Sequence, residues 1–509
     1  MTYHPSPNAK RRTPNAERLP HIGRPKTARP CVEKDDGKTQ KTMQSQILYE
    51  KRSPSRTSTP ISIRWIAIAT SFGFAVVQLD VTIVNVALQR ISTDLHASLA
   101  ALQWVIDAYA LVFAVLLLSA GVLGDRFGAK RTFSFGFLVF AVASLGCGIA
   151  PNAPFLITAR ALQGVGAALL VPSSLALLNH ACEDDARRRA HAIALWTASG
   201  GVAIAAGPVV GGLLLSGLGW RSIFLVNLPV CLVGFALTHF FASETKNRGR
   251  AKHLDLSGQF LAILSLSGLI AAVIESRPLG FANPLVIAGF ILALLGGTLL
   301  VVHEGRIASP MLPLEFFTRS RFSSAVIFGV LVNSTYYGII FVLSLYLQRA
   351  RGYSTIQAGL AFLPLTATFI FSNIASGLVS SRVGLRIPMV IGSLIGATGF
   401  ALLFFFTNQT AFVGMLPPFL LIPLGLGLAV PAMTTSILSS VDRVWSGTAS
   451  AVLNAARQAG GAVGVAVFGA LTSGEAAHQI ISGLQIAALV SAAMLVLGSV
   501  VSWTGIGQD

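Results

Sequence analysis

Residues 65–87 read WIAIATSFGFAVVQLDVTIVNVA, and Asp80 is the only charged residue in this run. About 20 consecutive apolar residues span a hydrocarbon layer of ~30 Å when they form a helix. The run is therefore long enough to cross a membrane, which would place Asp80 inside it. An ionisable side chain in hydrocarbon is costly, so Asp80 is a candidate functional residue.

Similar apolar runs continue along the chain as far as residue 504. They lie near 101–123, 133–150, 156–180, 190–215, 222–242, 257–275, 284–303, 322–347, 356–380, 387–406, 412–438, 447–472 and 481–504. Together with residues 65–87 they predict an all-α membrane protein with fourteen transmembrane helices.

The composition indicates the same class. Of the 509 residues, 53% are hydrophobic and 11% charged, whereas soluble domains carry about 25% charged residues. A formal net charge of +17 is typical of many nucleic-acid-binding proteins, but residues 1–63 alone hold 13 Lys/Arg against 5 Asp/Glu. Much of the other basic charge lies in short loops, where orientation in the membrane explains it. We therefore expect the lipid bilayer as a partner, and no nucleic acid.

The loop charges predict the orientation. With the N-terminus inside, the cytoplasmic connections hold 16 Lys/Arg and the opposite connections hold 5. The positive-inside rule then places both termini in the cytoplasm of a multi-pass protein of the cell (inner or plasma) membrane. Residues 1–63 read as a disordered basic tail. Two alternatives for this tail stay open: a true start at Met43, or a basic arm that touches anionic lipid.

A faint internal repeat divides the chain. The turn Gly121-Val-Leu-Gly-Asp-Arg-Phe-Gly-Ala-Lys-Arg131 is echoed eight predicted helices later by Gly377-Leu-Val-Ser-Ser-Arg-Val-Gly-Leu-Arg386. We therefore predict a six-helix bundle at 64–242, two inserted helices with their flanking loops at 243–320 and a second six-helix bundle at 321–509. Related halves with a site between them are typical of secondary transporters.

Four charged side chains fall well inside predicted helices: Asp80, Asp107, Arg160 and Arg457. A fifth, Glu275, ends the run 257–275 and is expected to be exposed to water. The first three lie at similar depth in the outer half of the first bundle. Desolvation favours the protonated form of a carboxyl group and a neighbouring guanidinium favours the ionised form, so this set can bind and release a proton. A buried Asp80–Arg160 pair that only fixes helix packing is the alternative.

The remaining candidates concern substrate and gating. Arg457 has either a substrate-binding role or a structural or gating role, and Gln78 and Asn85 are further candidates for substrate contact. The segment Gly207-Pro-Val-Val-Gly-Gly212 has glycines spaced for close backbone approach and a proline that can kink the helix. It is either a tight packing face or a pivot between the two halves.

Signals for catalysis are poor. Gly37-Lys-Thr39 resembles part of a phosphate-binding loop, but Val32 stands where its first glycine belongs and no strand precedes it. The four cysteines and nine histidines are scattered, without metal-ligand spacing. We expect neither an enzyme nor a metal or other cofactor, and a proton gradient as the energy source.

Over roughly residues 64–505 the sequence resembles a known family, the fourteen-helix drug/proton antiporters of the major facilitator superfamily. The helix-1 stretch from Leu79 to Leu88 and the run from Trp220 to Pro229 look characteristic of this branch. Three further signatures match. The loop motif matches at Gly121, Gly124, Asp125, Arg126, Gly128 and Arg131. The helix-4 motif matches at Arg160-Ala-Leu-Gln-Gly164 with Gly166, and the antiporter motif at Gly207, Pro208, Gly211 and Gly212.

The resemblance implies roles for these residues. Asp125, Arg126 and Arg131 would belong to a cytoplasmic gate, with Arg126 facing acids of the 183–185 loop. Arg160 would act in proton coupling, and the glycines from Gly207 to Gly212 would distinguish export from uptake.

The chain also departs from the family pattern. It has Gln89 where members often have proline, and the predicted helix 356–380 contains no acidic residue, which speaks against dicationic drugs as substrates. Ser380 and Ser381 replace the Gly-Asp pair of the first loop, so the gate would be asymmetric.

The leading hypothesis is a monomeric transporter that exports small hydrophobic or amphipathic compounds such as drugs in exchange for protons. A dedicated exporter of one natural product, sugar or siderophore is the first alternative. A membrane-embedded sensor that does not transport is the second.

Overall fold

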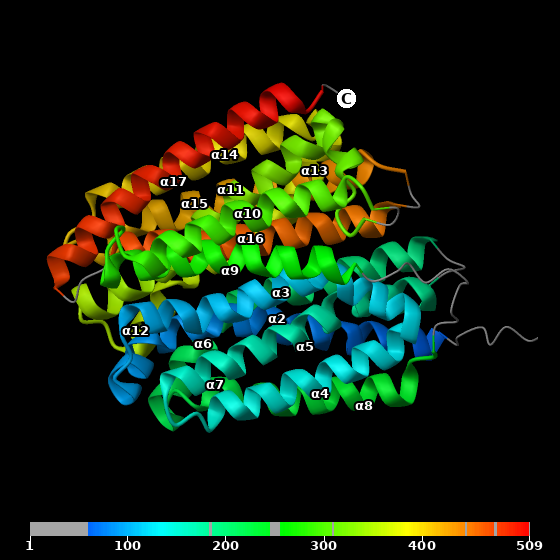
Figure 1. Ribbon diagram of the computed structural model, residues 1–509, viewed down its shortest axis with the longest axis horizontal. Coiled ribbons are helices and arrows are strands. Elements are labelled where there is room, and N and C mark those ends of the chain that lie inside the picture. Colours follow the sequence, from blue (N-terminus) through cyan, green and yellow to red (C-terminus); the bar gives the residue numbers. More distant parts are fainter. Residues whose placement is uncertain are drawn as a thin grey trace, which may run out of the picture. The chain divides into compact units, whose positions relative to one another are not determined.

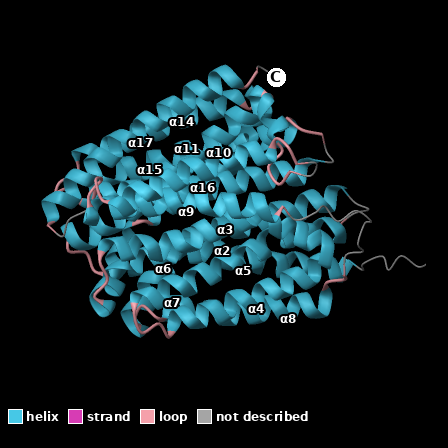
Figure 2. Cartoon of the chain, in the orientation of Figure 1, coloured by secondary structure: helices cyan, strands magenta, loops and turns pink. Residues whose placement is uncertain are grey.

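The computed structural model describes residues 60–182, 186–244, 255–307, 310–442, 445–472 and 476–507. Every regular element among these residues is a helix, and the long helices run side by side (Figures 1 and 2). The predicted tail, residues 1–63, lies almost entirely outside the described residues. The all-α class is confirmed.

The first set of helices covers residues 60–241. It consists of α2 (Pro60–Leu95), α3 (Leu99–Phe127), α4 (Ala129–Gly148), α5 (Ala153–Ala181), α6 (Ala186–Leu218), α7 (Ser222–Leu225) and α8 (Asn227–Phe241). Local chemistry sets several ends. The Ser98 side chain caps α3 by accepting from the backbone N–H of Ala101, and Gly128 separates α3 from α4 with φ of 93°, a value that favours glycine.

The rest of the chain forms a hairpin and a second set. The hairpin is α9 (Leu256–Leu279) and α10 (Pro284–Glu304), followed by the short η1 (Leu314–Thr318). The second set comprises α11 (Ser320–Leu345), the π-helical turn η2 (Tyr346–Ala350), α12 (Thr355–Ala361), α13 (Leu363–Val383), α14 (Arg386–Leu402), η3 (Leu403–Phe405), α15 (Phe412–Ser439), α16 (Ser446–Leu471) and α17 (Ala477–Gly505).

The α9–α10 hairpin lies beside the contact between the two sets. In it, α9 packs against both α3 and α16, and α10 packs against α9. Polar bonds fix α9 to α3: Gln259 donates to the carbonyl oxygen of Val115 at 2.9 Å, and Trp104 donates to Glu275 at 3.3 Å. Glu275 is therefore a bonded, partly buried residue rather than one simply exposed to water.

Each of the fourteen predicted runs coincides with helix, but the count of fourteen membrane spans is not confirmed. Twelve described helices are long and apolar enough to cross a membrane, or thirteen if Leu195–Ile204 and Ala206–Leu218 form one span bent by 44°. The bend in α6 lies one turn before Pro208, where proline removes a helical hydrogen bond. α16 falls short of these twelve, since it carries Arg457 and many small residues.

Candidate functional site

Asp80 and Arg160 form a buried ion pair in the first set of helices. Asp80 on α2 is fully buried and Arg160 on α5 is 1% exposed, and an Arg160 amino group donates to Asp80 Oδ2. Arg160 also donates from Nε to the carbonyl oxygen of Val105 at 2.9 Å. Its guanidinium carbon lies 4.3 Å from the centre of the Tyr109 ring. The charge of Arg160 is therefore compensated on several sides.

The other oxygen of Asp80 is also bonded. Its Oδ1 accepts from Gln163 at 2.9 Å and from Asn227 at 3.1 Å, and both amides donate to the Ser144 hydroxyl as well. Sequence reasoning missed these three polar residues. Gln163 carried a usable signal, because a residue three positions after Arg160 shares its helix face. Asn227 carried one too, because it lies in the run from Trp220 to Pro229, whereas Ser144 gave none.

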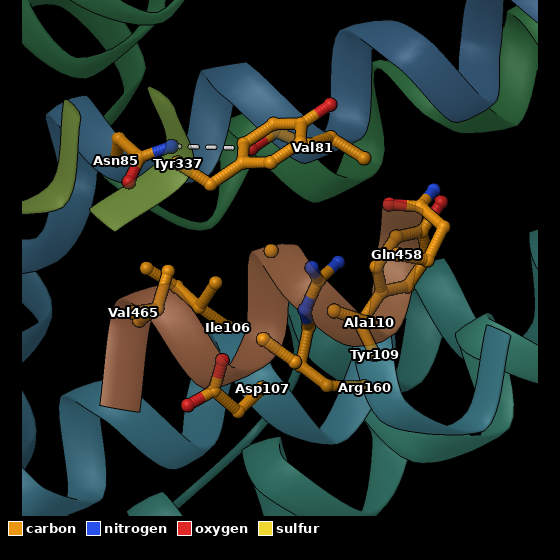
Figure 3. Close-up of a pocket in the computed structure, with 12 residues that line it drawn as sticks. Val81, Asn85, Ile106, Asp107, Tyr109, Ala110, Arg160, Tyr337, Gln458 and Val465 are labelled. Atoms are coloured by element: carbon orange, nitrogen blue, oxygen red, sulfur yellow. Dashed lines mark hydrogen bonds between the residues drawn. The ribbon is translucent and has the colours of Figure 1, made fainter. Parts of the chain in front are cut away.

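Asp107 on α3 stands in a different environment. It is fully buried, and neither of its carboxyl oxygens has a hydrogen-bond partner in the described chain. It lines a small cavity with room for about 20 Å³, enough for one water molecule. Arg160 lines the same cavity (Figure 3), but no ion pair joins it to Asp107 in the described structure.

This cavity lies where the two sets of helices meet. Val81 and Asn85 come from α2, Tyr337 from α11, and Gln458 and Val465 from α16 (Figure 3). The structure therefore brings two of the predicted proton-coupling residues, Asp107 and Arg160, to the boundary between the sets. Asp80 pairs with Arg160 but does not itself line the cavity.

The three predicted substrate-contact residues are placed differently. Asn85 lines the cavity and donates to the carbonyl oxygen of Val81 at 3.1 Å. Gln78 is partly exposed but does not line this cavity. Arg457 is partly exposed on α16, next to the cavity residue Gln458, and its Nε is buried without a hydrogen-bond partner in the described chain.

The Gly207–Gly212 segment of α6 touches both sets of helices. A Cβ added to Gly211 would lie 3.0 Å from Ile83 Cγ1 on α2, and one added to Gly212 would lie 3.0 Å from the carbonyl oxygen of Thr355 at the start of α12. Pro208 in the same segment lies against Gly359 of α12. The glycines thus allow close backbone approach within the first set and across to the second.

Hydrogen bonds join the two sets at the end where α2 and α6 finish. Ser344 donates to the carbonyl oxygen of Asn85 at 2.5 Å. Arg349 donates to Gln89 and, at 2.9 Å, to Ser92. Since these bonds link α11 and η2 to α2, this end of the molecule is closed.

The opposite end is open beside α2 and α6. A groove of about 1110 Å³ runs along residues 63–75 of α2 and residues 188–199 of α6. The predicted gate residues Asp125 and Arg126 are exposed at the end of α3. Arg131 Nε lies 3.4 Å from Glu244 Oε2, and both side chains are exposed. The predicted acidic partners of Arg126 at 183–185 lie outside the described residues.

Comparison with known proteins places this fold. The family model described as Major Facilitator Superfamily matches residues 70–465. A methylenomycin A resistance protein of Streptomyces coelicolor is 37% identical over 81% of this chain and 86% of its own length. A multidrug resistance protein, Stp, of Mycobacterium tuberculosis is 35% identical over 79% of this chain and 75% of its own. A tetracenomycin C resistance and export protein of Streptomyces glaucescens is 35% identical with the same coverage.

A solved structure shows the same fold at low sequence identity. It is a bacterial homologue of the human lysosomal transporter Spinster, with a TM-score of 0.63 and 17% identity over 88% of this chain and 97% of the other. The family match over most of the chain and the extent of the relatives lead to one conclusion. The chain is a multi-pass membrane protein that belongs to the major facilitator superfamily of transporters.

Proposed function

We propose that this chain exports small hydrophobic or amphipathic compounds, such as drugs, across the cell membrane in exchange for protons. The names of its relatives support the substrate class: they are resistance or export proteins for methylenomycin A, tetracenomycin C and multiple drugs. The observation that carries the proton coupling is Asp107, a fully buried carboxyl group without a hydrogen-bond partner at the boundary between the two sets of helices.

Asp107 fits a proton-binding role better than Asp80 does. A buried charge without donors is costly, so a carboxyl group such as Asp107 is accommodated when it carries a proton. Asp80 accepts from Arg160, Gln163 and Asn227, and three donors favour its ionised form. In this proposal Asp107 takes up and releases the coupled proton, while Asp80 holds Arg160 at the edge of the same cavity.

The open and closed ends fit a transporter that exposes its site to one side at a time. With the termini in the cytoplasm, the groove along α2 and α6 opens inward and the bonds around Arg349 close the outer end. Outward opening would separate α12 from α6. The Gly207–Gly212 segment, which approaches both α2 and α12, is suited to serve as the pivot.

The remaining assignments follow from this role. The proton gradient supplies the energy without a cofactor, the protein acts as a monomer in the cell membrane, and Asp125, Arg126 and Arg131 gate the cytoplasmic side. A dedicated exporter of one natural product is the second candidate, favoured by relatives named for methylenomycin A or tetracenomycin C.

Everted vesicles that contain the full chain test the coupling. An imposed proton gradient should drive uptake of exported compounds, and addition of such a compound should release protons from the wild type. Asp107→Asn should abolish both signals, because the amide cannot carry the proton. Asp442→Asn, in an exposed loop, serves as the matched control and should behave as wild type.

Asp80→Asn separates the two acids. It should retain compound-dependent proton movement in whatever fraction of the protein remains folded. Full coupling in Asp107→Asn would contradict the proposed role of Asp107, and loss of coupling only in Asp80→Asn would transfer that role to Asp80.

A further inference from the structure

Arg457 is a charged, partly exposed side chain near the middle of α16 in the second set of helices. It lies eleven residues from the start of α16, Ser446–Leu471, about 16 Å along the axis at 1.5 Å per residue. Snorkelling to either end over that distance is beyond the reach of an arginine side chain. Its charge must therefore be accommodated locally.

Among the described residues of the second set no acid pairs with Arg457, and Glu475 lies outside those residues. Between residues 320 and 507 the sequence contains Asp442 and Glu475 as its only acids, and both follow the ends of helices: Asp442 after α15 and Glu475 after α16. Arg457 makes no ion pair or hydrogen bond in the described chain, and its Nε is buried without a partner. A membrane-embedded guanidinium without a counter-ion is a strong candidate for binding an anion from outside the chain.

Aromatic residues lie on α11, which packs against α16, and Tyr337 is close enough to interact electrostatically with Arg457. Its aliphatic stem approaches Gly329 of α11, where an added Cβ would lie 3.2 Å from Arg457 Cγ. About two turns further along α11, Tyr336 and Tyr337 pack ring to ring with centroids 5.4 Å apart, and Tyr336 stacks on Phe369 of α13. Both tyrosines are partly exposed.

The polar atoms near Arg457 add directional recognition. Neither tyrosine hydroxyl donates to a residue in the described chain, so both phenols are available as donors. Gln458, the next residue of α16, and Tyr337 line the cavity that also contains Asp107. Guanidinium and phenol groups beside aromatic rings match a compound with an aromatic or apolar body and one anionic group.

We propose that Arg457 binds the carboxylate of an amphipathic organic acid, with the Tyr336–Tyr337–Phe369 cluster against the apolar body of the compound. This assignment names the substrate class and rests on the proposed export function. It also provides a reason for the placement of Asp107. An organic acid bound at Arg457 neutralises the positive charge of that side chain on α16. A proton on Asp107 neutralises the negative charge of that side chain on α3.

Three matched probes test the class: radiolabelled 2-naphthylacetate, its amide and 2-naphthylethylamine. Binding to the purified full chain in detergent is measured by scintillation proximity, and transport in everted vesicles energised by a proton gradient. The wild type should bind the carboxylate at least about tenfold more tightly than the amide, since charge-assisted bidentate hydrogen bonds are stronger than neutral ones. The amine should bind most weakly.

Substitutions at Arg457 should remove the preference without removing the site. Arg457→Gln should bind carboxylate and amide with similar affinity, the amide affinity staying within about twofold of wild type. Arg457→Lys should recover part of the preference, because it restores the charge but not the bidentate geometry. Arg277→Gln, at an exposed position on α9, is the matched control and should leave all three affinities unchanged.

The outcomes separate this inference from the proposed function. Export of the amide or amine by a wild type that shows no preference for the carboxylate would overturn the inference and leave drug export intact. Equal weakening of all three probes by Arg457→Gln would assign the residue a structural or gating role instead. Failure of the wild type to bind the carboxylate would overturn this inference, whereas the export function stands or falls with the compound-dependent proton movement of the wild type in everted vesicles.

Discussion

Arg160 and Arg457 are both arginines within long helices, one in each set, yet their surroundings are opposite. Arg160 has an acid, an amide oxygen, a carbonyl oxygen and a tyrosine ring around its guanidinium. Arg457 has no hydrogen-bonding partner in the described chain. The same residue type is therefore fully bonded in one half and without a hydrogen-bond partner among the described residues in the other, and the neighbouring helices make this difference.

Arg160→Gln should show the largest effect. Breaking a buried ion pair leaves an uncompensated charge, here on Asp80, and typically costs about 3–5 kcal/mol. We expect a strong fall in the thermal midpoint of the detergent-purified protein and in the yield of monodisperse material. The double variant Asp80→Asn/Arg160→Gln should recover much of the loss. An unchanged midpoint in the single variant would remove the contrast with Arg457.

Gln163→Leu tests how far the bonding of Asp80 extends beyond Arg160. The substitution removes one donor to Asp80 Oδ1 and one to Ser144. Unsatisfied buried polar groups cost about 1–3 kcal/mol each, so the thermal midpoint should fall, but less than in Arg160→Gln. Gln357→Leu, in the exposed capping box of α12, should have a smaller effect. Equal losses in the two variants would argue against a special network around Asp80.

Arg349→Gln tests the hydrogen bonds between the two sets of helices rather than the stability of either set alone. Loss of its bonds to Gln89 and Ser92 should destabilise the closed outer end by roughly 1 kcal/mol, as for a typical hydrogen bond. The fraction of molecules with an open outer end should therefore increase by a factor of about five. Labelling of Ala358→Cys, buried on α12, by a membrane-impermeant maleimide should rise accordingly in a background whose native cysteines are serine. Equal labelling with and without Arg349 would place the outer gate elsewhere.

Arg457→Gln should have the smallest effect on stability and so provides the sharpest contrast with Arg160→Gln. Since Arg457 has no hydrogen-bond partner to lose and an unpaired buried charge is itself costly, we expect the variant to unfold at the same temperature as wild type or at a higher one. The same thermal measurement in detergent checks this. A loss comparable to that of Arg160→Gln would show that Arg457 is part of the structural framework after all.

Much of the fold could be predicted because lipid imposes long apolar runs. Each run of the sequence falls on helix, since backbone groups in hydrocarbon must bond within their own segment. Hydropathy reports where the apolar part stops, however, and not where the helix stops. The run that ends at Ala87 belongs to a helix that continues to Leu95, and α16 is helical although its composition is not that of a typical span.

The site could be predicted only in part. Asp80, Asp107, Arg160 and Arg457 were identifiable because a charge in an apolar run needs an explanation. Their partners were not, since Asp80 and Asn227 are 147 residues apart in the chain and no spacing rule links helices so distant. Of the two acids that the sequence offered as proton sites, Asp80 is the better bonded, and the proposed function therefore assigns the coupled proton to Asp107.

The sequence by itself determined the membrane class, the positions of the helices, the charged residues inside them and, through the order of its motifs, the family. Only the tertiary structure decided which of those charges have partners. The reason is physical: apolar periodicity acts within one segment, whereas the free energy of a buried charge depends on donors and acceptors that other helices bring to it. Arg160 and Arg457 carry the same side chain, and their neighbours on other helices leave one paired and the other without a hydrogen-bond partner among the described residues.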